Sequence, residues 1–241
     1  MIRSYWKDLQ WLQLCLRSIA LHCFGFSEIV VVLPRSSRAW LDRTPLPEIA
    51  RVAYCPDYPD DYLGQQITKL FADTYVDTNF IVHVDSDCIF ARPTSPLDLH
   101  PDERPIVVTR PVAELGRAYP WRAATEAFLG CAIPFDFMQR PPFAYPRWLY
   151  PMIREHCLNT HRMPLDAYVL SRPARGFSEF NALGGYAWLH HRSRFDFRDA
   201  NATEAPVPYC DWHWSWGGLT PDVRAAIAER LAPRPDRERR S

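Results

Sequence analysis

The residues best suited to chemistry are two aspartates, Asp85 and Asp87, which flank Ser86 at the end of an apolar run that begins at Phe80. The run, FIVHV, consists mostly of strand formers and predicts a buried strand that stops at Asp-Ser-Asp. At a strand's carboxyl end in an α/β sheet, where ligands bind, two carboxylates can hold a divalent cation against a phosphate. Such hard oxygen ligands suit Mg²⁺ or Mn²⁺. Asp-Ser-Asp is equally ordinary turn chemistry after a strand, so both interpretations stay open.

Two polar side chains shortly before this strand could assist an anion site. Lys69 is one of only two lysines, because nearly all of the 28 basic residues are arginines. Apolar residues at helical spacing predict a helix from Leu63 to Tyr75, with Gln66 and Lys69 on its polar side. These two could meet a phosphate, or they could belong to a solvated helix face.

The order of the predicted elements favours an α/β fold with a mostly parallel central sheet. Before the acidic strand, the pattern predicts these elements: the end of a strand at 1–5, a helix at 6–22, strands at 28–33 and 51–55, and a loop at 56–61. After it, the pattern predicts these: a strand at 106–109, helices near 121–129 and 148–157, an extended loop at 140–146, a helix-like segment from 178 and a last helix at 220–231.

Composition narrows the possible classes of protein. With 241 residues, 47% of them hydrophobic, we expect one domain over 1–233 and a charged tail over 234–241. Basic and acidic residues balance at 28 each, which argues against non-specific nucleic-acid binding. Seven cysteines without CxxC spacing favour a reduced, cytoplasmic protein. No apolar run reaches the roughly 18 residues of a membrane span, so we expect no transmembrane segment.

A longer stretch carries a family resemblance. The run GQQITKLFADTYVDTNFIVHVDSDCIFARPTSPLDL resembles the segment of GT-A glycosyltransferases in which a donor-side helix precedes the metal-binding strand. The chain is also similar to an uncharacterised group of bacterial glycosyltransferase-like proteins with a later Ser-Glu-Phe-Asn stretch, here Ser178 to Asn181. The resemblance implies a single Rossmann-like GT-A domain, a nucleotide-sugar donor, a saccharide or other hydroxyl acceptor, and Mn²⁺ or Mg²⁺. The first strand is almost absent, which suggests a trimmed start.

The resemblance also implies roles for individual residues. Asp87 would bind the metal directly, while Asp85 would contact the ribose or the metal and Ser86 would lie on the donor side. His213, in DWHWSWGG, resembles the late histidine that completes the metal shell, although it could equally pack among the neighbouring tryptophans. The donor side would further include four residues: Ser4, Tyr5, Gln66 and Lys69.

An inverting reaction also needs a base for the acceptor hydroxyl. Glu179 is the first candidate, because it lies at a predicted helix start before Gly184 and Gly185, which weaken the helix and could let it line a cleft. Asp211 and Asp136 follow. A glutamate near a helix start is also a common structural feature.

Two other functions fit parts of the sequence. A strand ending in Asp-x-Asp also opens phosphatases of the haloacid dehalogenase type, in which Asp85 would be the nucleophile. Those enzymes need a later lysine, and no lysine follows Lys69. A non-catalytic sugar-binding module would use the tryptophans but has no need of the acidic pair, and the tryptophans could also simply fill core.

Overall fold

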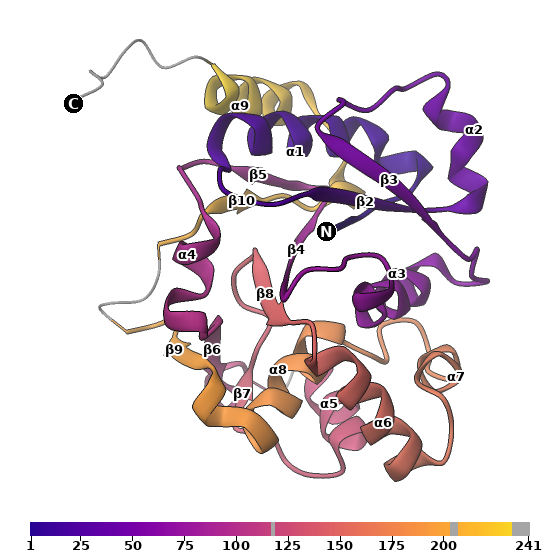
Figure 1. Ribbon diagram of the computed structural model, residues 1–241, viewed down its shortest axis with the longest axis vertical. Helices are drawn as coiled ribbons and strands as arrows, with labels where there is room; N and C mark the ends of the chain where they lie inside the picture. Colours follow the sequence, from indigo (N-terminus) through magenta and orange to yellow (C-terminus); the bar gives the residue numbers. More distant parts are fainter. Residues whose placement is uncertain (117–118, 203–206, 233–241) are drawn as a thin grey trace.

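A five-stranded sheet lies at the centre of the protein in this computed structural model, which describes residues 1–116, 119–202 and 207–232 (Figure 1). The strands are β1 (Ile2–Arg3), β2 (Ile29–Pro34), β3 (Ala50–Cys55), β4 (Phe80–Asp85) and β8 (Phe143–Pro146), in the order β3-β2-β1-β4-β8. The first four run parallel, and β8 runs antiparallel to β4. The predicted α/β class with a mostly parallel central sheet is confirmed.

Helices and smaller strands make up the rest of the described chain. The helices are α1 (Leu9–His22), α2 (Arg38–Leu41), α3 (Asp61–Leu70), α4 (Pro96–Leu99), α5 (Trp121–Leu129), α6 (Leu149–His161), α7 (Leu165–Leu170), α8 (Glu179–His191) and α9 (Pro221–Leu231). The smaller strands are β5 (Cys88–Phe90), β6 (Ile106–Pro111), β7 (Phe135–Asp136), β9 (Asp196–Asp199) and β10 (Cys210–Trp212). They form a β7-β6-β9 sheet and a β10-β5 pair.

Helices cover both faces of the central sheet, as alternate residues of β2 show. Val30 and Val32 enter the core that contains the apolar side of α3. Val31 and Leu33 enter the core that contains the apolar side of α1. Successive side chains of a strand point to opposite faces, so alternate residues of β2 pack into the cores on the two sides of the sheet. Figure 1 shows α1 and α9 on one side of the sheet and α3 with α5 to α8 on the other.

The chain reverses its direction of travel across the sheet between β1 and β4. From β1 it passes through α1 to β2, and then through α2 to β3, moving steadily away from β1. From β3 it returns through α3 to β4, which pairs with the other side of β1. Such a reversal leaves a crevice at the carboxyl ends of the two neighbouring strands, where ligands bind in open α/β sheets.

The loop predicted at 140–146 was wrong for its second half. Phe143 to Pro146 form β8, pairing with β4 from Phe80↔Pro146 to His83↔Phe143. The four residues of β8 are buried, and proline at the end of an edge strand is tolerated because it need not donate to a partner. The prolines of this segment therefore mark a sheet edge.

Helix α8 is regular across its two glycines, and the prediction that they could let it line a cleft was wrong. A Cβ on Gly184 would lie 2.7 Å from Cγ of Phe137, and one on Gly185 would lie 2.6 Å from Cδ1 of Leu129. The two glycines let α8 approach its neighbours closely, and both are buried. They pack the helix into the core and do not open a cleft.

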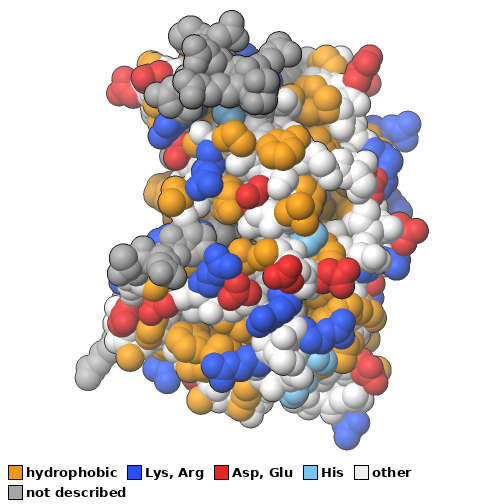
Figure 2. All heavy atoms as spheres, turned by 60° about the vertical axis from the view of Figure 1, so that its left-hand side comes forward, with side chains coloured by type: hydrophobic (Ala, Val, Ile, Leu, Met, Phe, Trp, Pro, Cys, Tyr) orange, Lys and Arg blue, Asp and Glu red, His pale blue; other side chains and the backbone are white. Residues whose placement is uncertain are grey.

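The tail predicted at 234–241 lies outside the described residues. On the face drawn in Figure 2, basic and acidic side chains of the described residues are interspersed among hydrophobic ones. Within the described part of the chain, no helix is long and apolar enough to cross a membrane.

Candidate functional site

The acidic pair lies where the topology places a crevice. Asp85 is the last residue of β4 and pairs with Arg3, the last residue of β1. Ser4 and Tyr5 continue from β1 at the same edge of the sheet. The predicted position of Asp85 and Asp87 at a strand's carboxyl end therefore agrees with the structure, and Ser4 and Tyr5 come from the neighbouring strand.

A buried lysine joins Asp85 to Glu179. The Lys69 ammonium lies 2.7 Å from Oδ1 of Asp85 and 2.7 Å from Oε1 of Glu179, although 110 residues separate Lys69 from Glu179. It also lies 4.8 Å from the centre of the Phe180 ring. Burial alone would lower the pKa of Lys69, but the two carboxylates outweigh burial and hold this pKa above its ordinary value. Lys69 is thus a fixed positive charge.

This arrangement overturns the solvated-face interpretation of α3. Gln66 and Lys69 are 2% and 3% exposed, so this side of the helix is buried against the rest of the protein. Oε1 of Gln66 has no hydrogen-bond partner, which leaves one buried acceptor open at this position. A direct role for either residue in donor binding stays a prediction.

Asp87 is held by the segment that follows β10. The backbone N–H of Ser215 donates to its Oδ2 over 3.0 Å, and the backbone N–H of His213 donates to its carbonyl oxygen over 3.0 Å. The second carboxylate oxygen, Oδ1, is buried and has no partner. Burial first, and the charge of Asp85 second, raise the pKa of Asp87 to about 7. A buried carboxylate with one unpartnered oxygen is costly by itself, and a cation would relieve that cost.

The backbone N–H of His213 makes its hydrogen bond to Asp87. Its ring packs against Trp11, with 5.5 Å between the ring centres. Burial lowers the pKa of His213, which favours the neutral imidazole that metal binding requires. Among the described residues, no three His, Cys, Asp or Glu side chains lie close enough together to form a metal site.

Asp8 is a third carboxylate at this edge, and no sequence motif identifies it. It ends the short 3-10 turn Trp6–Asp8 that follows β1. Its carboxylate lies near the side chain of Ser215, the residue whose backbone N–H donates to Asp87. Burial raises the pKa of Asp8 to about 6, and the charges of Asp61 and Asp85 add to the effect. In the sequence, the one feature that points to Asp8 as a site residue is its position shortly after the first strand.

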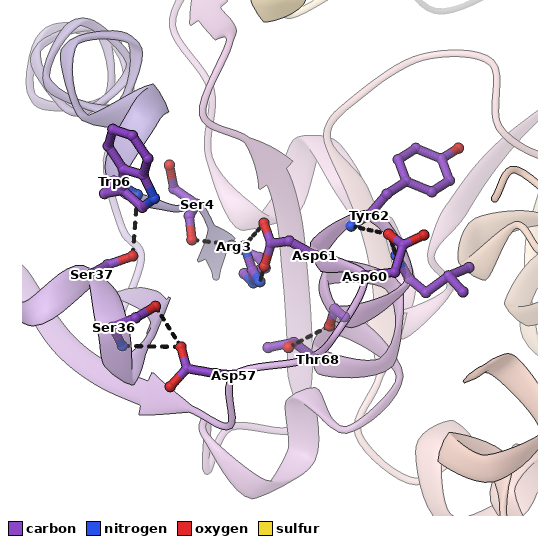
Figure 3. A network of polar contacts seen from close by, with 12 residues as sticks. Arg3, Ser4, Trp6, Ser36, Ser37, Asp57, Asp60, Asp61, Tyr62 and Thr68 are labelled. Atoms are coloured by element: carbon purple, nitrogen blue, oxygen red, sulfur yellow. Dashed lines mark hydrogen bonds and ion pairs between the residues drawn. The ribbon is translucent and has the colours of Figure 1, made fainter.

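The segment after β1 is braced by a buried arginine (Figure 3). Arg3 is 4% exposed, forms an ion pair with Asp61 at the start of α3, and donates to the carbonyl oxygen of Ser4 over 2.8 Å. The Ser4 hydroxyl is buried and has no partner. The N–H of Trp6 donates to Oγ of Ser37, which ties the segment to the residues that follow β2. The backbone after β1 is therefore fixed from two sides.

A cleft opens beside this segment. Its volume is about 380 Å³, and its lining comes from the residues after β1, from α1, from the segment between β10 and α9, and from the first turn of α9. The lining residues are Tyr5, Lys7, Asp8, Gln10, Trp11, Ser215, Trp216, Gly218, Leu219 and Arg224. Because Ser215 contacts both Asp8 and Asp87, the cleft adjoins the acidic pair.

The three candidate bases lie in different surroundings. Glu179 is 6% exposed and paired with Lys69, so its carboxylate is already engaged. Asp211 lies on β10 and forms an ion pair with Arg230 of α9 over 3.0 Å. Asp136 is buried and accepts a hydrogen bond from the Tyr119 hydroxyl over 2.6 Å. Only Glu179 is joined to the acidic pair, through Lys69.

Comparison with known proteins adds one match. Residues 41–130 match the model of a family of unknown function (DUF6492). This stretch includes α3 with Lys69 and β4 with the acidic pair, but it ends before Glu179 and His213. No curated protein matches the chain.

Proposed function

We propose that the chain is a metal-dependent glycosyltransferase of the GT-A type, which moves a sugar from a nucleotide-sugar donor to an acceptor hydroxyl. The observation that carries the proposal is the position of Asp85 and Asp87 beside the end of β1, where the chain reverses across the sheet. The unpartnered, buried Oδ1 of Asp87 supports a cation at this point. Oxygen ligands of this kind favour Mg²⁺ or Mn²⁺.

The reaction needs the negative charge of the departing diphosphate to be neutralised. A bound cation supplies this as a Lewis acid. Asp87 would hold the cation, since its carboxylate is oriented by the N–H of Ser215 and keeps one oxygen free. Asp85 would be oriented by its ion pair with Lys69. This pairing also lessens the repulsion between the two aspartates, so that both can face one cation.

Glu179 remains the candidate base only if its contact with Lys69 loosens when substrates bind. The Glu179 carboxylate is engaged by the buried Lys69 ammonium, so it would have to leave this ion pair to reach an acceptor hydroxyl. Its structural role is already visible: it fixes Lys69, which in turn fixes Asp85. We therefore assign Glu179 a positioning role first.

Nucleotide release from a panel of nucleotide sugars, with Mn²⁺ and with chelator, tests the proposal. We expect Mn²⁺-dependent release from at least one donor, and its loss in Asp87→Asn. A phosphatase that uses Asp85 as nucleophile would instead release phosphate from phosphomonoesters, so both products are measured. Phosphate release that disappears in Asp85→Asn, without any nucleotide release, would replace the proposal with the phosphatase function.

A further inference from the structure

Two tryptophans are exposed beside the cleft. Trp214 is 61% exposed and Trp216 is 82% exposed, the largest exposed fraction among the large hydrophobic side chains of the described residues. An indole left in water forgoes the favourable burial of a large apolar surface, so a cluster of exposed indoles marks a surface that binds something.

The tryptophans form a row. The ring centres of Trp212 and Trp214 lie 5.3 Å apart with nearly parallel planes, and those of Trp214 and Trp216 lie 6.5 Å apart. Trp212 anchors the row, because it belongs to β10 and contacts Phe143 of the central sheet. The exposed indoles are therefore the outer part of a supported row.

The backbone that follows Trp216 has free space around it at Gly217 and Gly218. A Cβ on Gly217 would meet no atom within 4 Å, so packing within the chain does not require glycine there. Gly218 has a φ of 74°, a conformation that glycine adopts without strain. Two glycines after Trp216 leave room for a ligand to approach the indole and the backbone together.

Polar groups of both charges line the cleft next to Trp216. Lys7 and Arg224 are positive, Asp8 is negative, and Gln10 offers an amide that already accepts from Arg224 over 2.8 Å. The mixed charge suits a polar ligand without net charge. Aromatic faces next to planar hydrogen-bonding groups match the chemistry of a sugar, whose rings carry apolar C–H faces and hydroxyl edges.

We propose that Trp214, Trp216 and the adjoining cleft bind a neutral saccharide chain, with the indoles as the stacking surface. Ser215, which lines the cleft and whose backbone N–H donates to Asp87, connects this surface to the candidate cation site. The saccharide would then be the acceptor, a role that rests on the proposed transferase function. The binding surface itself does not depend on catalysis.

Titration of the full chain with short neutral oligosaccharides of glucose, galactose, mannose and N-acetylglucosamine tests the inference. Intrinsic tryptophan fluorescence and calorimetry report binding. We expect at least one oligosaccharide to bind, and Trp216→Ala to weaken it by about tenfold or more, as loss of a central aromatic contact does. Since Trp216 is exposed, this variant is expected to fold normally.

Trp40→Ala is the matched control. Trp40 is also partly exposed, at 38%, but it stacks on Trp6 and does not line the cleft. Saccharide affinity unchanged in Trp40→Ala and lost in Trp216→Ala would support the surface. Equal affinity in wild type and Trp216→Ala would overturn it. Trp216-dependent binding of nucleoside diphosphates or of lipid vesicles, without saccharide binding, would overturn it as well.

Different results would refute the transferase proposal and the saccharide-binding proposal. Saccharide binding that needs Trp216, in a chain that releases no nucleotide from any donor, would keep the surface and refute the transferase. Nucleotide release in which Trp216→Ala leaves the acceptor KM unchanged would keep the transferase and refute the acceptor role of the surface.

Discussion

Replacing Asp87 with asparagine should stabilise the metal-free protein while removing its cation binding. The pKa of Asp87 rises from its ordinary 3.8 to about 7 in the folded protein. Each pKa unit corresponds to about 1.4 kcal/mol, so the buried charge costs the fold at most about 4 kcal/mol above neutral pH. Asparagine keeps an oxygen that can accept from Ser215, and we expect a gain of about 1–4 kcal/mol.

The stability difference between Asp87→Asn and wild type should change with pH in a definite direction. Because the folded pKa of this acid is raised, its favourable contribution is full below the unfolded pKa and is lost as pH rises toward about 7. The stability difference between Asp87→Asn and wild type should thus be greatest near pH ~8 and shrink toward pH ~4. Urea unfolding with chelator present measures it at each pH.

Addition of Mn²⁺ should raise the stability of wild type relative to Asp87→Asn. Wild type should gain about 2.7 kcal/mol at a hundredfold excess over the Kd, whereas Asp87→Asn should gain nothing. Asp211→Asn is the matched control, since Asp211 is 42% exposed and paired with Arg230, so we expect it to change stability little. An Asp87→Asn protein that is less stable than wild type near pH ~8 with chelator would refute this reasoning.

Three further substitutions test the surroundings of the site. Lys69→Met should destabilise the fold by about 3–5 kcal/mol, because Asp85 and Glu179 lose their shared cation; a change below about 1 kcal/mol in urea unfolding would argue against the buried network. Glu179→Gln should lower unfolding free energy together with turnover, whereas a loss of turnover of about 10²-fold at unchanged stability would favour the general-base role. Gly184→Ala should cost about 1–3 kcal/mol through its clash with Phe137, and an unchanged melting temperature would show that α8 can shift freely.

Local pattern was sufficient to predict the acidic strand. The run from Phe80 contains strand formers and ends in two aspartates, and both features depend only on neighbouring residues. The parallel order of the sheet followed from alternating strands and helices in the same way. Neither prediction depends on contacts between residues that are far apart in the sequence.

The partners of Lys69 could not be predicted, because they are brought together by the fold. Glu179 lies 110 residues away, and nothing near Lys69 indicates that its side of α3 will be buried. The pairing of β8 with β4 was missed for the same reason, since prolines around Phe143 favour a loop locally. Asp8 lacked any motif and was identified only by its contact with Ser215.

The most direct test of the central claim is a calorimetric titration of Mn²⁺ into the protein, with and without a nucleoside diphosphate. We expect that Mn²⁺ binds wild type, that the nucleotide tightens this binding, and that Asp87→Asn abolishes both effects. Mn²⁺ and nucleotide binding that are independent of each other and unchanged in Asp87→Asn would contradict a cation-assisted diphosphate site at the ends of β1 and β4.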